Sequence, residues 1–197
     1  MSFVQEIIQP QAPEAALFIK DMYTGESVSL SHEAETAKVM LEAGIGKGDP
    51  MSPALFSAML GHALSPVLKK WEKKGWGYKG TARNGERYRL PIVAYADDIT
   101  LMATTQVQAN GMLADVSKAL RVINLIIEPA KCSVLWSKYT EGHDTTAIHM
   151  GDGHIPIEPN IEILGQLVSF QRNSEHSQRH RIEKTWQVAF ANSTLIR

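Results

Sequence analysis

This sequence of 197 residues has one cysteine, no long apolar run and almost no net charge. Its single cysteine, Cys132, excludes an intramolecular disulfide framework and a zinc cluster built on cysteine. The apolar runs fall far short of the roughly 20 residues that span a membrane. The N-terminus also lacks the basic and apolar regions of a secretion signal. Hydrophobic residues make up 44% of the chain and charged residues 21%, as in ordinary globular proteins. We therefore expect an intracellular, folded chain.

The formal net charge of -1 conceals blocks of opposite sign. Residues 1–49 hold three basic and eight acidic side chains, whereas residues 69–89 hold eight basic and two acidic ones. Residues 90–170 are acidic again, and residues 171–197 are basic. A local basic block can neutralise phosphates even when the total charge is near zero. Solvated lysines beside a helix would give the same pattern.

Apolar spacing predicts an α+β chain with hairpins instead of regular strand–helix–strand alternation. We expect helices over residues 13–24, 53–74, 106–124 and 174–191, and strands over residues 28–30, 90–95, 99–103 and 133–136. In the second helix, Ser52 is expected to be the N-cap and Pro53 the first helical residue. Pro66 is expected to kink this helix, and the Gly75-Trp76-Gly77 segment to end it.

Two adjacent carboxylates, Asp97 and Asp98, stand between two β-prone runs that must reverse direction there. Neighbouring carboxylates repel unless a positive charge lies between them, and a divalent metal ion is the usual solution. A pair of Mg²⁺ ions at such a site supports nucleotidyl transfer. The alternative is an Asp-Asp turn that only closes the hairpin.

A glycine-rich loop, residues 43–50, precedes the second helix. Its glycines allow close approach of another backbone, and the following helix N-terminus favours an anion. The loop is not a P-loop, because Gly48 follows Lys47 where serine or threonine is required. A plain helix-entry turn explains the loop equally well.

Taken together, these motifs resemble a reverse transcriptase. The sequence Gly48–Phe56 is followed about forty residues later by Tyr95-Ala96-Asp97-Asp98, then by Leu125–Lys131 and by Leu164-Gly165. The resemblance covers about residues 15–170. It is closest to the non-LTR (LINE-like) retrotransposon class, with group II intron maturases next.

The resemblance implies a right-hand polymerase palm, an antiparallel sheet backed by helices, over residues 1–170. Residues 171–197 would begin a thumb or connection. The implied activity is RNA-directed DNA synthesis by two-metal nucleotidyl transfer with Mg²⁺ or Mn²⁺. The implied partners are an RNA template, a DNA primer and a deoxynucleoside triphosphate, with no membrane. The nucleus is then a candidate location, although no targeting signal is recognised.

The resemblance also assigns roles to individual residues. Asp97 would be a catalytic metal ligand and Asp98 a weaker one, while Lys131 would lie near the triphosphate. Leu164 and Gly165 would support the primer backbone. The residues that would face the nucleotide or template base are Lys47, Gly48, Asp49, Pro50, Ser52, Phe56, Tyr95 and Ala96. The basic segment 69–89 and the last helix would contact phosphates.

The sequence also departs from the family pattern. No aspartate before Gly44 fits the strand that carries the family's first catalytic carboxylate, and the fingers strands are not recognised. Lys47 replaces a usual glutamine, Gly46 a common arginine and Glu128 a usual asparagine. We therefore expect an N-terminally truncated, partial palm with an incomplete two-metal site, inactive by itself, and unpaired strand edges beside the Asp97 hairpin. The alternative is a non-catalytic nucleic-acid-binding or structural remnant of a retroelement.

Other candidate residues have simpler explanations. His176 and His180 are four residues apart, but surface positions explain them better than a metal site. Cys132 is expected to be a packing residue, not a nucleophile. Trp71, Trp76 and Tyr78 could stack on nucleic-acid bases, although packing in the core or at a helix end is the favoured interpretation.

Overall fold

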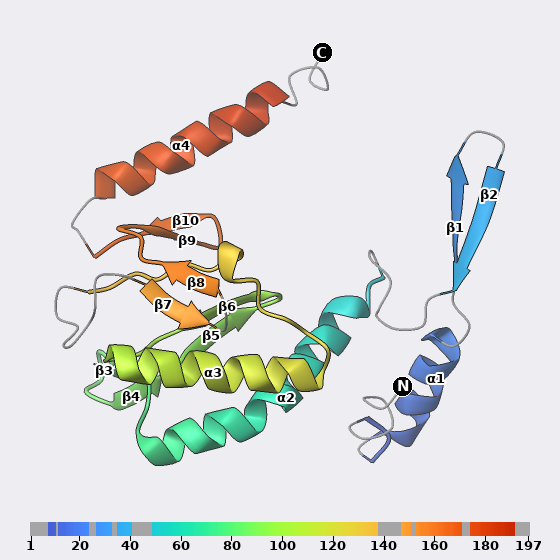
Figure 1. The fold of residues 1–197 in the computed structure, drawn as a ribbon, viewed down its shortest axis with the longest axis horizontal. Helices are drawn as coiled ribbons and strands as arrows, with labels where there is room; N and C mark the ends of the chain where they lie inside the picture. Colours follow the sequence, from blue (N-terminus) through green and yellow to red (C-terminus); the bar gives the residue numbers. More distant parts are fainter. Residues whose placement is uncertain are drawn as a thin grey trace. The chain divides into compact units, whose positions relative to one another are not determined.

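The computed structural model of the chain describes residues 8–10, 12–23, 27–32, 35–40, 49–137, 147–150, 153–170 and 174–191 (Figure 1). The chain forms two compact units, Met1–Ala63 and Leu64–Arg197. This division falls inside a helix. The predicted division into a palm at 1–170 and a thumb at 171–197 is based on the family resemblance, not on compactness, and stays a prediction.

The first unit holds a helix, a hairpin and the start of a second helix. Helix α1 spans Pro13–Tyr23 and buries Ala16 and Ile19, which are three residues apart and so share one face. Strands β1 (Ser27–His32) and β2 (Glu35–Met40) pair antiparallel. The predicted first helix and first strand are confirmed, whereas β2 was not predicted.

Helix α2 spans Ser52–Lys74, and its start corrects the predicted cap. The carbonyl of Met51 accepts the first helical hydrogen bond, from the Leu55 N–H at 3.0 Å, so Ser52 is already helical. The polar turn lies earlier: the Asp49 carboxylate accepts from the Met51 N–H at 2.8 Å, and the Asp49 carbonyl accepts from the Ser52 N–H at 3.1 Å. Asp49 takes this place because its short carboxylate reaches the backbone two residues ahead.

The end of α2 is the predicted glycine stop. Gly75 has φ +70°, a left-handed conformation that glycine adopts without a Cβ penalty. The Gly75 N–H donates to the Glu72 carbonyl at 3.0 Å and the Trp76 N–H to the Trp71 carbonyl at 2.9 Å. This pair of bonds is a Schellman motif, which satisfies the last carbonyls of the helix. Pro66 lies inside the helix, which continues past it.

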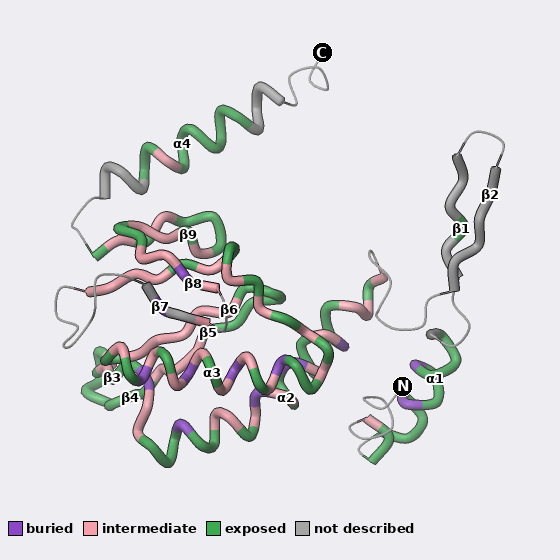
Figure 2. The backbone as a smooth tube through the Cα atoms, viewed as in Figure 1, coloured by how far each residue is buried: buried purple, intermediate pink, exposed green. Residues whose placement is uncertain are grey.

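In the second unit, helix α3 (Gln106–Val122) supplies much of the core. Thr105 is its N-cap and accepts from the Gln108 N–H at 3.2 Å, while the buried Gln108 amide accepts from the Thr104 N–H at 2.6 Å. Met112, Val116 and Leu120 recur every four residues and are buried, so the predicted helix and its apolar face are confirmed. The buried positions form a stripe along the helix in Figure 2.

Trp71 joins the end of α2 to α3. Its side chain is fully buried, and its indole Nε1–H donates to the Asp115 carboxylate at 3.0 Å. The ammonium of Lys70 reaches the other oxygen of the same carboxylate at 2.6 Å. The burial of a tryptophan and a charge-assisted hydrogen bond therefore act at one point of the helix pair.

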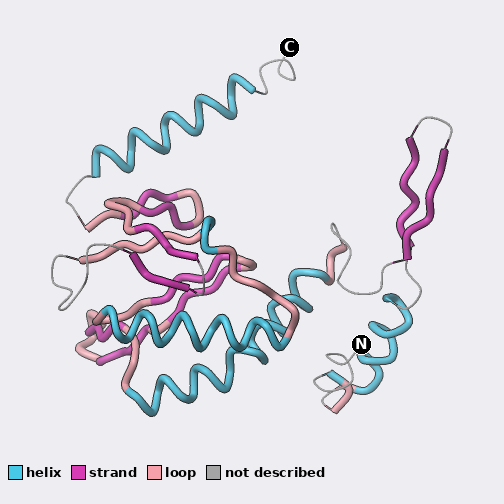
Figure 3. The backbone as a smooth tube through the Cα atoms, viewed as in Figure 1, coloured by secondary structure: helices cyan, strands magenta, loops and turns pink. Residues whose placement is uncertain are grey.

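The strands of the second unit pair only as hairpins (Figure 3). The pairs are β3 (Tyr78–Thr81) with β4 (Arg87–Leu90), β5 (Ile92–Tyr95) with β6 (Asp98–Leu101), β7 (Ala147–Met150) with β8 (Gly153–Pro156), and β9 (Ile161–Ile163) with β10 (Gln166–Val168). All are antiparallel, so the α+β class is confirmed. Within the described residues the ribbons do not join into one sheet, and the palm arrangement stays a prediction.

Three helices contact these ribbons. Helix α3 contacts β6 and β7, the short 3-10 helix η2 (Pro129–Lys131) contacts β8, and α4 (Ser174–Ala191) contacts β10. The predicted last helix is confirmed. In the described parts of the chain, no helix is long and apolar enough to cross a membrane.

The predicted strand at residues 133–136 is wrong. Only Val134 pairs, in a parallel bridge with Ile157, through bonds from the Val134 N–H to the Pro156 carbonyl and from the Glu158 N–H to the Val134 carbonyl. The next ladder bond toward the N-terminus would need an N–H at residue 156, and proline has none. The ladder therefore cannot extend in that direction.

We predict that the Trp71 link dominates the stability of the second unit. Trp71→Phe removes the N–H that serves a charged acceptor and should lower the free energy of unfolding by about 1.5–3 kcal/mol. Trp71→Ala should cost about 3–5 kcal/mol. Urea unfolding measures both. Trp186→Phe, at an exposed position of α4, is the matched control and should change stability by less than about 0.5 kcal/mol. Equal effects at the two tryptophans would contradict the prediction.

We also predict an acid-sensitive contribution from Asp115. Burial acts to raise the pKa of its carboxyl, but the hydrogen bonds from Lys70 and Trp71 and the charges of Lys70 and Lys74 outweigh burial and hold the pKa below 3.8. A lowered native pKa means that the unfolded chain takes up the proton first. The contribution is therefore complete above about pH 4 and is lost as the pH falls through the native value. Urea midpoints between pH 6 and pH 3 should fall less steeply in Asp115→Asn than in the wild type.

Candidate active-site hairpin

The β5–β6 hairpin presents the predicted Asp97-Asp98 pair at its tip. Tyr95 pairs with Asp98, so Ala96 and Asp97 form a two-residue loop. The Met102 N–H donates to the Pro91 carbonyl at 2.9 Å and extends the ladder away from the tip. The predicted hairpin is confirmed.

Side chains alternate between the two faces of this ribbon, so its half-buried apolar residues and its exposed residues lie on different faces. Ile92, Leu101 and Ile99 share one face and are half-buried, and α3 contacts β6. Tyr95 and Asp98 are direct partners on the other face, where Tyr95 is 67% exposed. The apolar face holds the ribbon in the unit and leaves the tip open to solvent.

Ala96 has φ +51°, a left-handed conformation that is rare for a residue with a Cβ. The favoured two-residue hairpin loops have positive φ at their first position, because their twist matches that of the strands. Alanine holds this conformation at a cost of about 1–2 kcal/mol. The backbone strain therefore lies directly before Asp97.

Asp97 and Asp98 offer oxygen atoms of the kind that Mg²⁺ and Mn²⁺ bind. Both residues are exposed, and within the described part of the chain neither carboxylate takes part in an ion pair. The described residues also contain no group of three or more acidic, histidine or cysteine side chains placed to hold a metal ion. The donors therefore fit a divalent ion in kind, and the hairpin supplies two of them.

The predicted nucleotide-facing residues before α2 belong to the first unit. Asp49 is half-buried in the turn before α2, Pro50 is exposed, and Ser52 and Phe56 are half-buried in the first turns of the helix. Lys47 and Gly48 lie outside the described residues. Tyr95–Asp98 lie in the second unit, so a joint nucleotide site stays a prediction.

Lys131 ends the 3-10 helix η2 and forms an ion pair with Glu128 at 2.7 Å. The side chains are 79% and 57% exposed, so the pair is solvated. The hydrogen bond and the charge of Glu128 raise the pKa of Lys131 above its usual value. Glu128 therefore gives Lys131 an anionic partner.

Leu164 and Gly165 form the two-residue loop between β9 and β10. Ile163 pairs with Gln166, and the loop residues have φ +49° and +76°, the pattern of a type I′ turn. Leu164 is 54% exposed. The predicted Leu-Gly turn is therefore present, and its role at a primer stays a prediction.

Glu162 on β9 links this hairpin to α4. Its carboxylate forms an ion pair with the ammonium of Lys184 and lies 3.5 Å from Nε2 of His180. The hydrogen bond and charge of Lys184 hold the pKa of Glu162 below its usual value, and His180 acts in the same direction. Two of the basic residues of the last helix therefore face an acidic partner on the hairpin, which sequence reasoning did not anticipate.

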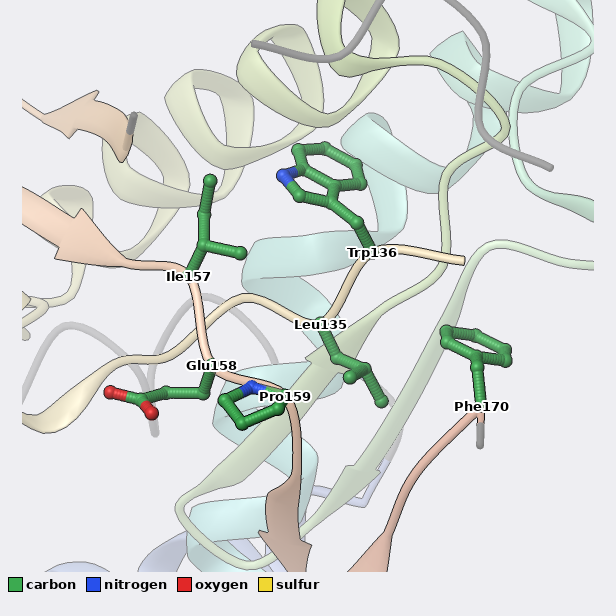
Figure 4. A pocket seen from close by; sticks show the side chains of 6 residues that line it. All are labelled: Leu135, Trp136, Ile157, Glu158, Pro159 and Phe170. Atoms are coloured by element: carbon green, nitrogen blue, oxygen red, sulfur yellow. The ribbon is translucent and has the colours of Figure 1, made fainter. Parts of the chain in front are cut away.

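A shallow apolar pocket of about 300 Å³ lies close to the Val134–Ile157 bridge. Trp136 and Ile157 project to the same side of the two bridged segments in Figure 4, and Leu135 points to the other side. The pocket is lined by Leu135, Trp136, Ile157, Glu158, Pro159 and Phe170. The apolar run at residues 134–136 was the signal in the sequence, and it was interpreted there as a strand.

Burial distinguishes the candidate residues for base stacking and nucleophilic attack. Trp71 is fully buried, so the favoured packing role is confirmed and base stacking is excluded. Trp76 lies against Gly111 and under the Lys74 ammonium, which is 4.2 Å from its ring centroid. Tyr78 remains exposed. Burial, aided by the charge of Glu128, raises the pKa of the Cys132 thiol, which disfavours the thiolate and a nucleophilic role.

The sequence model of the reverse transcriptase (RNA-dependent DNA polymerase) family matches residues 4–168. The match covers most of the chain, so the chain belongs to the reverse transcriptase family, as the motifs predict.

Two relatives narrow the class, and both are the Retrovirus-related Pol polyprotein from type-1 retrotransposable element R2 of Popillia japonica. One is 31% identical over 98 residues, 50% of this chain and 13% of the relative. The other is 25% identical over 124 residues, 63% of this chain and 19% of the relative. The chain is thus a reverse transcriptase domain similar to that of the R2 non-LTR retrotransposon, and it spans less than a fifth of the length of these relatives.

We predict that the strain at Ala96 can be removed. Ala96→Gly should raise the free energy of unfolding by about 1 kcal/mol, because glycine adopts positive φ without the Cβ clash. Ala94→Gly, two residues earlier in β5, is the matched control and should lower it by about 0.5–1 kcal/mol. Urea unfolding separates the two. A loss of stability at both positions would exclude strain at the loop.

Proposed function

We propose that this chain carries the catalytic hairpin of an RNA-directed DNA polymerase with a right-hand palm. Its partners would be an RNA template, a DNA primer and a deoxynucleoside triphosphate. The observation that supports this proposal is the exposed Asp97-Asp98 pair on a strained two-residue loop, in a chain of the reverse transcriptase family. The apolar face of the ribbon packs in the second unit, where α3 contacts β6, and this packing holds the strands that carry the carboxylates.

Asp97 and Asp98 would hold Mg²⁺ or Mn²⁺. When bound, these ions would activate the primer hydroxyl and stabilise the leaving pyrophosphate. Tyr95 shares a face with Asp98 and would lie beside the primer terminus and the incoming nucleotide. Lys131 would lie near the triphosphate, where its ammonium could neutralise the leaving pyrophosphate or donate a proton to it. Leu164 and Gly165 would support the primer backbone.

We further propose that the 197-residue chain does not polymerise by itself. Two carboxylates from consecutive residues can hold one ion weakly, whereas bridging two ions needs a third carboxylate from another strand. In a partial palm of this kind, residues 1–170 would form the palm fragment and residues 171–197 the start of a thumb. The alternative is a non-catalytic module that binds nucleic acid, and the excess of basic side chains in residues 69–89 favours it.

Primer extension tests the polymerase. The purified chain, given an RNA template, a DNA primer, deoxynucleotides and Mg²⁺ or Mn²⁺, should yield no template-dependent product. The same chain joined to the upstream reverse transcriptase segment of an R2 relative should extend the primer. Asp97→Ala in that fusion should abolish extension. Extension by the chain alone would overturn the proposed incompleteness, and a fusion that remains inactive would favour the binding module.

Metal binding separates the two functions without catalysis. Asp97→Asn should weaken Mn²⁺ binding by at least about tenfold, because it removes one of two anionic ligands. Titration calorimetry or the electron paramagnetic resonance signal of free Mn²⁺ measures the change. Glu183→Gln, at an exposed position of α4, removes the same charge elsewhere and should leave the affinity unchanged. Equal affinities in all three proteins would exclude a metal site at the hairpin.

A further inference from the structure

The two tyrosines of the β3–β4 hairpin share one face. Gly80 pairs with Tyr88, and Tyr78 pairs with Leu90, so the tyrosines are diagonal neighbours across the strands. Their ring centroids are 6.5 Å apart and the rings are inclined by 57°. Tyr78 is 49% exposed and Tyr88 is 46% exposed. The pair therefore presents aromatic surface to solvent.

Gly80 makes the room for this arrangement. A Cβ at residue 80 would lie 2.3 Å from Cζ of Tyr88 and 2.4 Å from its hydroxyl oxygen. The Tyr88 ring thus occupies the space that a side chain on the partner strand would fill. Any larger residue at position 80 must displace the ring.

The opposite face of the same hairpin is basic. Lys79 pairs with Arg89, and Thr81 pairs with Arg87, so the three cationic side chains alternate with the tyrosines. The guanidinium of Arg89 donates to the Glu72 carbonyl at 3.3 Å, whereas Lys79 and Arg87 are exposed. The hairpin belongs to the block at residues 69–89, which contains eight basic and two acidic side chains.

We propose that the β3–β4 hairpin is a binding site for single-stranded nucleic acid. Unpaired bases stack on Tyr78 and Tyr88, and the basic side chains on the opposite face of the two-stranded ribbon supply positive charge that attracts the phosphates. Every base offers a π face, so exposed aromatic rings on a basic hairpin suit a single strand without regard to its sequence. A duplex keeps its bases stacked on one another and can use only the charge.

This site is separate from the hairpin that carries Asp97. The inference rests on the proposed function in that nucleic acid is the partner, but it needs neither metal nor catalysis. RNA and single-stranded DNA share the recognised chemistry, so both are tested.

Fluorescence anisotropy of the full chain tests the proposal. The probes are end-labelled RNA and DNA strands of about 12 nucleotides and a duplex of the same sequence. The wild type should bind both single strands more tightly than the duplex. The double variant Tyr78→Leu with Tyr88→Leu should bind single strands at least about tenfold more weakly and the duplex unchanged.

Gly80→Ala is the sharper variant, because it keeps both tyrosines and every charge. The atoms that must move are the outer atoms of the Tyr88 ring, so the fold should survive while the ring leaves its place. Single-strand binding should weaken several-fold. Gly61→Ala, where an added Cβ meets nothing within 4 Å, and Phe170→Leu, at an aromatic that is 60% exposed elsewhere, are the matched controls and should bind as the wild type does.

The charge contribution has its own readout. Lys79→Gln with Arg87→Gln should reduce the dependence of log Kd on log salt by about 0.7 for each phosphate that is no longer neutralised. Mn²⁺ affinity should be unchanged in the double variant Tyr78→Leu with Tyr88→Leu, so a failure of the proposed polymerase and a failure of this site are distinguishable.

Three results would overturn the proposal. The first is unchanged affinity for single strands in the tyrosine and Gly80 variants. The second is equal binding of single strands and duplex by the wild type. The third is displacement of RNA by polyglutamate that is equally effective in wild type and tyrosine variants, which would indicate an acidic polypeptide partner.

Discussion

The Trp71–Asp115 hydrogen bond is the interaction on which the second unit depends. It fixes the end of α2 to the middle of α3 inside the core, and α3 in turn contacts β6, which begins with Asp98. A carboxylate that is mostly shielded from water would be costly without partners, but Trp71 and Lys70 both bind it. The site at the tip of the β5–β6 hairpin is therefore supported by a polar link outside it.

The architecture of separate hairpins explains how the site is built. Each ribbon closes through its own short turn, so the local sequence determines the position of each tip. The outer edges of β5 and β6 have no strand partner within the described residues. Such edges can accept another strand, which is what the proposed third carboxylate would require. The same feature makes the isolated hairpin prone to association.

Acidic and basic side chains lie on two hairpins that follow one another in the chain. The β5–β6 tip collects carboxylates that suit divalent ions, and the β3–β4 ribbon carries the cations that suit phosphates. The formal charge of -1 is the sum of acidic and basic blocks along the whole chain, and it hides both of these local surfaces.

The local features and the family follow from the amino-acid sequence. Glycine at the end of α2, the reversal at Ala96-Asp97 and the helices of residues 13–23, 106–122 and 174–191 follow from short-range rules, because neighbouring residues decide caps, turns and periodicity. The motif order identified a reverse transcriptase. The start of α2 was misplaced, because an aspartate three residues earlier forms the turn.

Contacts between residues distant in the chain could be known only from the fold. The sequence favoured packing over base stacking for Trp71, and the structure buries the residue and pairs it with Asp115. The strand predicted at 133–136 is reduced to a single bridge at Val134, and Pro156 on the partner segment prevents its extension toward the N-terminus. Likewise, Gly80 and Tyr88 are eight residues apart in the chain, but they pair across the strands, and the Tyr88 ring occupies the space beside Gly80. Periodicity describes which face a residue occupies, but the identity of the residue across from it is a property of the fold.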